Sequence, residues 1–398
     1  MPRHDLPEPS EDARHFVIDP GVVYLNHGSF GACPDPVLKA QDAHRRRAER
    51  ELVRFYTQDA WALLDRSRAA LGPVVGADPA DLVFVRNATT GVATVLANIA
   101  LAPGDEVLTT TLEYPACEHN LRAAADRTGA AVVFAEIPWP IGSEDAVVGA
   151  VLDRVTDRTR LCMLSLVTSA TGVRMPIERL IPALRDRGVR VLLDAAHGPG
   201  CVPMNLGAWG ADYATGNAHK WLCAPKGAAF LHVRPEHQDG FRPLVLSNDA
   251  RRLPEASAAT GRSAFNHAFD YAGTDDISPY LTIADAIGWL DTTVPGGLGA
   301  LMGRNRALAI EGRDAVLAAL GLAAPVPDAM LGPMAAITLD RPGAEAPALK
   351  RRLMDGFAIE IPVWGAPGSR VGVRLSAQMY NSPPQYAYLA RALGSVLS

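Results

Sequence analysis

Short, nearly continuous apolar runs alternate with longer segments of helical periodicity through the first two thirds of the chain. Such apolar runs are typical of strands buried on both faces of a parallel sheet. Helical spacing predicts intervening helices such as Trp61–Leu71, which Gly72-Pro73 should stop, and Ile177–Arg187. Strands are predicted at residues 22–26, 82–85, 104–110, 132–134, 159–167, 189–194 and 211–214. This alternation predicts an α/β fold.

Beyond Phe230 the pattern changes. Residues 234–266 are rich in Arg, Pro, Ser and Ala, which predicts loops around the mouth of a site. Predicted helices (280–290, 301–320 and 386–397) then mix with strands (335–339 and 358–361), as in a small α+β domain. We therefore expect an N-terminal arm at residues 1–20, a large domain at 21–280 and a small C-terminal domain at 281–398.

Composition narrows the class of protein. The 398 residues are 48% hydrophobic and carry a net charge of −5, which indicates a globular chain and gives no reason to expect a nucleic acid or an anionic membrane as partner. The polar start and the lack of eighteen consecutive apolar residues argue against a signal peptide and a membrane span. Five scattered cysteines indicate reduced thiols, no metal site and a cytoplasmic location.

Lys220 is the most informative titratable residue. The chain has only four lysines against a large excess of arginine, so arginine supplies most of the surface charge. Lys220 follows Asp194, which ends a predicted buried strand, and His197. Lysine forms Schiff bases, whereas arginine stays protonated. A carboxylate followed by a lysine predicts a site for an aromatic aldehyde cofactor; alternatively, Lys220 caps a strand or pairs with Asp212.

Polar turns follow other predicted strands. The turn Arg86–Gly91 precedes an Ala/Val/Leu helix, an arrangement that presents backbone N–H groups and a helix dipole to a phosphate. Alternatively, Thr89 or Thr90 is only a helix N-cap. Thr168–Gly172 lies at the carboxyl end of an apolar strand, where open α/β sheets bind ligands.

Three motifs carry a family resemblance: Asn26–Gly31, Asp194–His197 and Gly216–Leu222. Together they resemble the class V aminotransferase superfamily of fold type I pyridoxal-phosphate enzymes, and within it the isopenicillin N epimerase-like branch. The resemblance covers nearly the whole chain, from about Val22 to the C-terminus. It implies a large domain with a mainly parallel seven-stranded sheet, a small α+β C-terminal domain, and a homodimer with active sites at the subunit interface.

The resemblance also implies roles for individual residues. Asp194 would hold the pyridine nitrogen, and Lys220 would form the Schiff base and then remove the substrate Cα proton. His197 and Ser169, or Thr168 in its place, would contact the phenolic oxygen, while Tyr114 would stack on the ring. The implied phosphate ligands are Ala88, Thr89, Thr90, Asn217, His219 and, from a second subunit, Gly273 and Thr274. The implied substrate contacts are Asn26, His27, Ser29 and Arg374.

Several of these residues have a plainer interpretation. His197 could cap the loop before Pro199, Tyr114 could be a core residue, and Arg374 could be an exposed charge on an edge strand. The segment Gly273-Thr274 could be an ordinary loop. Family members usually carry Arg after this threonine, and Asp275 stands there instead, which leaves the substrate open.

The implied reaction begins with an external aldimine to an α-amino acid or its conjugate, followed by loss of the Cα proton. Epimerisation or Cβ–S elimination in specialised metabolism is favoured over transamination, and decarboxylation is less expected. Sulfur transfer through a persulfide is disfavoured because no cysteine follows Cys223. An inactive scaffold would have lost Lys220 or Asp194, and a dinucleotide-binding dehydrogenase would need an early Gly-x-Gly-x-x-Gly.

Overall fold

The computed structural model describes residues 6–366 and 370–397. Its main element is a seven-stranded sheet in the order β2-β8-β7-β6-β5-β3-β4, parallel except for β8. The strands are β2 (Leu82–Val85), β3 (Glu106–Thr110), β4 (Ala131–Ala135), β5 (Thr159–Ser165), β6 (Arg190–Ala195), β7 (Tyr213–Asn217) and β8 (Ala229–Val233). The predicted α/β fold with a mainly parallel seven-stranded sheet is confirmed.

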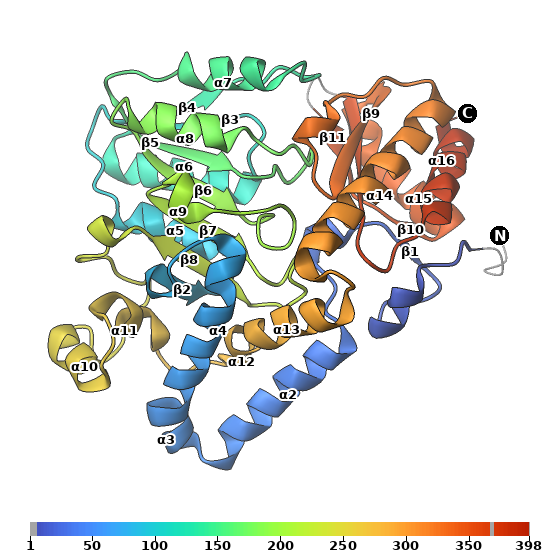
Figure 1. Ribbon diagram of the computed structural model, residues 1–398. Helices are drawn as coiled ribbons and strands as arrows, with labels where there is room; N and C mark the ends of the chain where they lie inside the picture. The colour runs from blue at the N-terminus through green and yellow to red at the C-terminus, as the bar shows by residue number, and fades with distance from the viewer. Residues whose placement is uncertain (1–5, 367–369, 398) are drawn as a thin grey trace.

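Helices surround this sheet and form the large lobe with it (Figure 1). Two predictions about them are wrong. The helix expected to stop at Gly72-Pro73 continues to Val75, because the burial of Leu71 and Val75 outweighs the hydrogen bond lost at Pro73. The region expected to be all loops contains two helices, α10 and α11. The helices of this lobe are α4 (Ala60–Val75), α5 (Ala88–Asn98), α6 (Pro115–Thr128), α7 (Glu144–Leu152), α8 (Ile177–Arg185), α9 (Leu206–Trp209), α10 (Leu253–Thr260) and α11 (Ala264–Asp270).

The C-terminal elements form a second lobe, drawn in orange and red in Figure 1. Its three-stranded antiparallel sheet has the order β11-β12-β9, so β12 is the central strand. The elements are α14 (Gly297–Leu320), β9 (Met334–Pro342), α15 (Ala346–Phe357), β10 (Ile359–Glu360), β11 (Val363–Ala366), β12 (Arg370–Ser376) and α16 (Pro383–Leu397). The preceding helix α13 (Ile283–Thr293) packs mainly against α4 of the large lobe.

The N-terminal segment crosses between the lobes. Its strand β1 (Val23–Tyr24) pairs in parallel with β10 of the C-terminal lobe. The short helix α1 (His27–Phe30) follows, where a loop was expected, and then come α2 (Asp35–Arg50) and α3 (Leu52–Arg54). The helix α12 (Ser278–Leu281) packs against α2 and α4. None of the helices in the described ranges has the length and apolarity that a membrane crossing requires.

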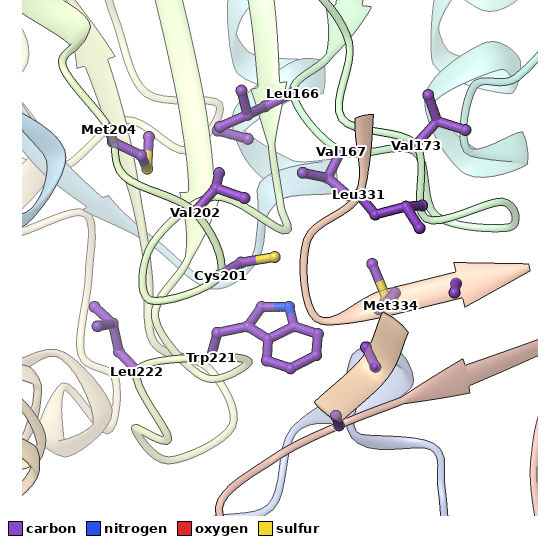
Figure 2. Packing of buried hydrophobic residues seen from close by; sticks show 14 of the residues in the cluster. Leu166, Val167, Val173, Cys201, Val202, Met204, Trp221, Leu222, Leu331 and Met334 are labelled. Atoms are coloured by element: carbon purple, nitrogen blue, oxygen red, sulfur yellow. The ribbon is translucent and has the colours of Figure 1, made fainter. Parts of the chain in front are cut away.

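An apolar core joins the two lobes. Figure 2 shows Cys201, Val202 and Trp221 of the large lobe near Leu331 and Met334 of the C-terminal region, and all five belong to one buried cluster. Trp221 directly follows Lys220 in the chain and is completely buried. The position of the main chain at Lys220 is therefore tied to the packing between the lobes.

The start of α5 lies very close to β7 because of Gly91. A Cβ atom at this position would lie 2.1 Å from the Thr215 hydroxyl oxygen. Gly91 therefore allows the helix N-terminus to approach the carboxyl end of the neighbouring strand.

We predict that Gly91→Ala lowers the free energy of unfolding by about 1–3 kcal/mol, because the added methyl group overpacks the contact with Thr215. Urea denaturation measures the change. The matched control is Gly149→Ala in α7, where the new Cβ meets open space and should raise stability by up to about 1 kcal/mol. Equal effects of the two substitutions would contradict the close approach.

Candidate active site

A cavity of about 340 Å³ opens at the carboxyl ends of β5, β6 and β7, next to the N-terminus of α5. Ligands bind at this edge in open α/β sheets. The structure brings most of the predicted site residues together in its wall. The predicted residues that line it are Ser29, Ala88, Thr89, Tyr114, Ser169, Asp194, His197, Asn217, His219 and Lys220.

Lys220 and His197 form the central contact of this cavity. The Lys220 Nζ lies 3.0 Å from His197 Nε2, and the Trp221 indole N–H donates to His197 Nδ1 at 3.2 Å. An indole nitrogen is only a donor, so a neutral His197 carries its hydrogen on Nε2. That hydrogen points at Lys220 Nζ, which accepts it only through the lone pair of an uncharged amine. Lys220 does not pair with Asp212, which accepts instead from the Val191 amide and contacts His237.

Burial shifts the titration of both groups. Desolvation, followed by the positive charge of Arg374, lowers the pKa of Lys220 from 10.5 to about 8. Desolvation and the charge of Lys220 hold the pKa of His197 well below 6.5. His197 is therefore neutral at neutral pH, and Lys220 loses its proton far more readily than an exposed lysine.

Asp194 lies at the end of β6 with its side chain buried. Its Oδ1 accepts from the Ala196 amide at 2.9 Å, and its Oδ2 accepts from the Cys117 thiol at 3.2 Å. Burial raises the pKa of Asp194, and these two hydrogen bonds only partly oppose the effect. Asp194 therefore holds a proton more readily than an exposed aspartate does.

The first turn of α5 offers a site for an anion. The Ala88 amide donates to Asn217 Oδ1 and the Thr90 amide donates to Asn87 Oδ1, both at 2.8 Å. The Thr89 amide has no partner among the described residues, and Thr89 lines the cavity. The N-cap is Asn87, so neither threonine is the N-cap considered from the sequence. Thr90 lines a different cavity on the other side of the turn.

His219 is held at one ring nitrogen. Its Nδ1 lies 3.0 Å from the Ala228 carbonyl oxygen, which can only accept, so Nδ1 carries a hydrogen. Burial lowers the pKa of His219 to about 4. In the neutral ring the other nitrogen, Nε2, therefore has no hydrogen to donate. It donates to an anion only when the charge of that anion stabilises the protonated ring.

Arg374 is a buried cation that has no acidic partner within residues 6–366 and 370–397. Because β12 is the central strand, Arg374 is 3% exposed and is not an edge charge. Its guanidinium donates to the Ser169 carbonyl, to Asn26 Oδ1 at 3.3 Å and to Ser29 Oγ at 3.1 Å, while Nε has no partner. Burial lowers the pKa of Arg374 to about 10. Such a group favours a carboxylate ligand.

Seven of the residues predicted from the sequence do not line this cavity: Asn26, His27, Thr90, Thr168, Gly273, Thr274 and Arg374. His27 is fully buried behind it, and both ring nitrogens are bonded inside the protein, to Tyr380 and to the Lys220 carbonyl. Thr168 is also fully buried and bonds to Thr171, so Ser169 alone of the two reaches the cavity. These placements correct the expectation that His27 contacts substrate and that Thr168 is interchangeable with Ser169.

Gly273 and Thr274 line a second cavity of about 350 Å³, together with Thr90 and Arg86. Asp275, the residue after Thr274, forms an ion pair of 2.6 Å with Arg86. The structure thus separates Gly273 and Thr274 from Lys220 of the same chain.

Sequence reasoning missed three residues at the cavity: Ser165, which lines its wall, and Glu113 and Cys117, which contact Ser165 and Asp194 from behind. The Glu113 carboxylate accepts from Thr110 Oγ1 at 2.8 Å and from the Ser165 amide at 3.2 Å, and Ser165 Oγ donates to its other oxygen. Burial raises the pKa of Glu113 to about 7, and the charge of Asp194 adds to the rise. A glutamate at the end of a predicted strand, just before Tyr114, was the available signal.

The sequence profile of the family described as Aminotransferase class-V matches residues 30–319. Isopenicillin N epimerase of Amycolatopsis lactamdurans is 33% identical over 385 residues, which cover 94% of this chain and 95% of that protein. L-cysteine desulfhydrase of Arabidopsis thaliana is 30% identical over 421 residues, which cover 96% of this chain and 89% of that protein. The chain belongs to the class-V aminotransferase family.

A solved structure supports the same fold. A variant of C-DES with glycine covalently linked to its PLP cofactor matches with a TM-score of 0.79 and 19% identity, covering 96% of this chain and 99% of that chain. The class-V family and this fold confirm that the protein is a fold type I enzyme and that pyridoxal phosphate is its cofactor.

The cavity fits this cofactor. The wall supplies an amine with a lowered pKa at Lys220, a basic carboxylate at Asp194, and an unpaired helix amide at Thr89 for the phosphate. These groups come from different elements around one cavity of about 340 Å³. The class-V enzyme therefore has the donors and acceptors that the aldehyde, the ring nitrogen and the phosphate require.

We predict that Arg374→Gln raises the pKa of Lys220, because it removes a buried positive charge that disfavours the ammonium form. The pH dependence of Lys220 labelling by an amine reagent, measured by mass spectrometry on the apoprotein, reports this pKa. Arg370→Gln is the control, since Arg370 lies on the same strand but is exposed. A pKa unchanged in the Arg374 variant would contradict the electrostatic coupling.

We predict that Glu113 makes stability depend on pH. Its pKa rises from about 4.5 unfolded to about 7 folded, so its stabilising contribution is complete below about pH 4.5 and is lost as pH rises through 7. In Glu113→Gln, the fall in unfolding free energy between about pH 5 and pH 8 should be smaller than in the parent. Urea denaturation at both pH values tests this, with the partly exposed Glu118→Gln as the control. An identical fall in the parent and the Glu113 variant would contradict the shift.

Proposed function

We propose that this class-V enzyme is a carbon–sulfur lyase that removes the Cα proton of a cysteine-type α-amino acid with Lys220. The observation that carries the proposal is the contact between Lys220 Nζ and the Nε2–H of His197 at 3.0 Å. The contact holds the amine of Lys220 in the cavity, where burial and the charge of Arg374 lower its pKa to about 8, which suits a general base near neutral pH. Asp194 supports the same proposal as the partner of the ring nitrogen.

Arg374 would bind the substrate carboxylate. Its buried Nε has no partner, and Asn26 and Ser29 hold the rest of the guanidinium in place. The side-chain amide nitrogen of Asn26 donates to the Glu360 carboxylate at 3.0 Å. This contact directs the other side-chain atom of Asn26, Oδ1, toward Arg374. The substrate would therefore enter with its carboxylate toward β12 and its amine toward Lys220.

The proton path follows from these contacts. Lys220 Nζ would take the Cα proton, and the Cβ–S bond would break with its electron pair leaving on sulfur. Pyridoxal phosphate, when bound, draws off the electron pair left at Cα. The thiolate would leave with the proton returned from Lys220, and the three-carbon remainder would hydrolyse to pyruvate and ammonia. His197, neutral and carrying Nε2–H, would donate to the phenolic oxygen once Lys220 moves away.

The titratable groups of the cavity favour elimination over epimerisation. Elimination needs one base, whereas epimerisation needs a second acid on the opposite face of Cα. In the part of the chain that the structure describes, the titratable residues of the wall are Tyr114, Asp194, His197, His219 and Lys220. In this proposal Asp194 binds the ring nitrogen, His197 lies beside Lys220, and His219 lies at the phosphate. Tyr114 is then the titratable residue that remains to act as the second acid.

Epimerisation is the second candidate. Tyr114 is 44% exposed and lines the cavity, so among the described residues its hydroxyl is the group that would return a proton to the other face. The similarity to isopenicillin N epimerase supports this candidate, as the similarity to L-cysteine desulfhydrase supports the first. A cavity of about 340 Å³ is near the lower end for ligand pockets, which favours a small amino acid.

We propose a homodimer in which Gly273 and Thr274 contact the cofactor phosphate of the partner subunit. These residues line a cavity separate from that of Lys220, and the exposed apolar residues Leu244 and Val245 line it as well. Exposed apolar side chains next to a cavity are typical of a subunit interface.

We predict that the holoenzyme releases sulfide and pyruvate in equal amounts from L-cysteine. In Lys220→Ala the rate should fall by on the order of 10²–10⁴-fold, because the general base is lost. Product assays with L-cysteine and L-cystine measure this, and Lys226→Ala is the control because Lys226 is exposed. Inversion at Cα with the side chain intact would instead establish an epimerase, and a keto acid that retains its sulfur would establish a transaminase.

A further inference from the structure

His27 is bonded to two parts of the protein at once. Its Nε2 lies 3.0 Å from the carbonyl oxygen of Lys220, and its Nδ1 lies 2.9 Å from the hydroxyl oxygen of Tyr380. The side chain is completely buried. It therefore joins the main chain of the predicted base to the segment between β12 and α16.

The partners fix the tautomer of His27. A carbonyl oxygen can only accept, and the Ala32 amide near Nδ1 can only donate, so Nε2 carries the hydrogen and donates it to Lys220. The side-chain amide nitrogen of Gln378 also lies 3.2 Å from Nε2. Nδ1 then accepts from the Tyr380 hydroxyl and from the Ala32 amide at 3.3 Å. Burial lowers the pKa of His27 to about 3, so the neutral form persists across the physiological range.

The main chain at Lys220 needs such support because the turn that follows is strained. Cys223 has φ = 57°, which is unfavourable for a residue with a Cβ. The carbonyl of Lys220 accepts from the Cys223 amide at 3.1 Å as well as from His27. Gly31, with φ = 70°, allows the segment that carries His27 to lie directly against this turn. A Cβ atom at position 31 would lie 2.1 Å from the His219 carbonyl oxygen.

His27 also supports the partner of Lys220. Its ring packs on Trp221 with the ring centroids 4.8 Å apart, and the Trp221 indole N–H donates to His197. The His27 ring thus supports both residues of the Lys220–His197 contact: Lys220 through its carbonyl, and His197 through Trp221.

We propose that His27 is a positioning residue that holds the Lys220 main chain and, through Trp221, the His197 ring, so that Nζ reaches the reacting atoms. The inference rests on the proposed function, in which Lys220 is the base. It assigns to His27 a role without substrate contact, and it predicts an effect on kcat rather than on KM.

Two variants separate the hydrogen bond from the packing of the ring. Asparagine at position 27 keeps a polar group near Nδ1 and loses the donor to Lys220, whereas glutamine places its amide N–H near the position of Nε2. Tyr380→Phe is the matched control: it removes the bond at Nδ1, and the Ala32 amide still holds the tautomer. The first readout is the rate at which the apoprotein takes up pyridoxal phosphate, followed by the absorbance of the lysine-bound cofactor. The second is hydrogen exchange at the Cys223 amide.

In His27→Asn we expect cofactor uptake to slow about tenfold, the Cys223 amide to exchange faster, and kcat with L-cysteine to fall about 10–100-fold with KM within about twofold. His27→Gln should recover most of the uptake rate, and Tyr380→Phe should keep it within about twofold. Normal uptake and exchange in a folded His27→Asn would overturn the inference, as would equal losses in the Asn and Gln variants. If Lys220→Ala takes part in turnover as well as the parent, the proposed function fails instead, whatever the His27 variants show.

Discussion

The burial of the Lys220 amine is the constraint on which the rest of the site depends. An ammonium group in a buried position needs a counter-ion, but the charge with the largest effect on the pKa of Lys220 is that of another cation, Arg374. The amine therefore loses its proton easily, and its nearest hydrogen-bond partner, the Nε2–H of His197, suits the uncharged form. Among the residues that the structure describes, Asp194 is the one acidic residue that lines the same wall.

The fold brings these groups together through strand order. Asp194 and Ser165 are paired residues at the ends of β6 and β5, and Asn217 ends the adjacent strand β7. Because the three strands run parallel, their carboxyl ends meet at one edge. The helix α5 supplies its N-terminus at that edge, and Gly91 allows the helix to come close enough. Arg374 comes from the central strand of the other lobe, and its guanidinium donates to the carbonyl of Ser169, which lines the cavity.

The parts of the structure that sequence could predict are those set by local patterns. The apolar run at Leu82–Val85 became β2 with the same bounds, and Asp194 was expected at the end of a buried strand because apolar residues precede it. The burial of Arg374 depends on which strand of a sheet is central, and no local pattern encodes that. The direction in which His27 points depends on how a four-residue helix packs on the Lys220 turn, which is a tertiary property.

The most direct test of the central claim is proton NMR in heavy water on the holoenzyme with L-cysteine and a panel of L- and D-amino acids. It follows exchange of the Cα proton independently of what later leaves the substrate. If Lys220 is the base, the parent exchanges this proton in amino acids that lack a leaving group, and the Lys220→Ala variant with bound cofactor does not. Equal exchange rates in the two proteins would contradict the account.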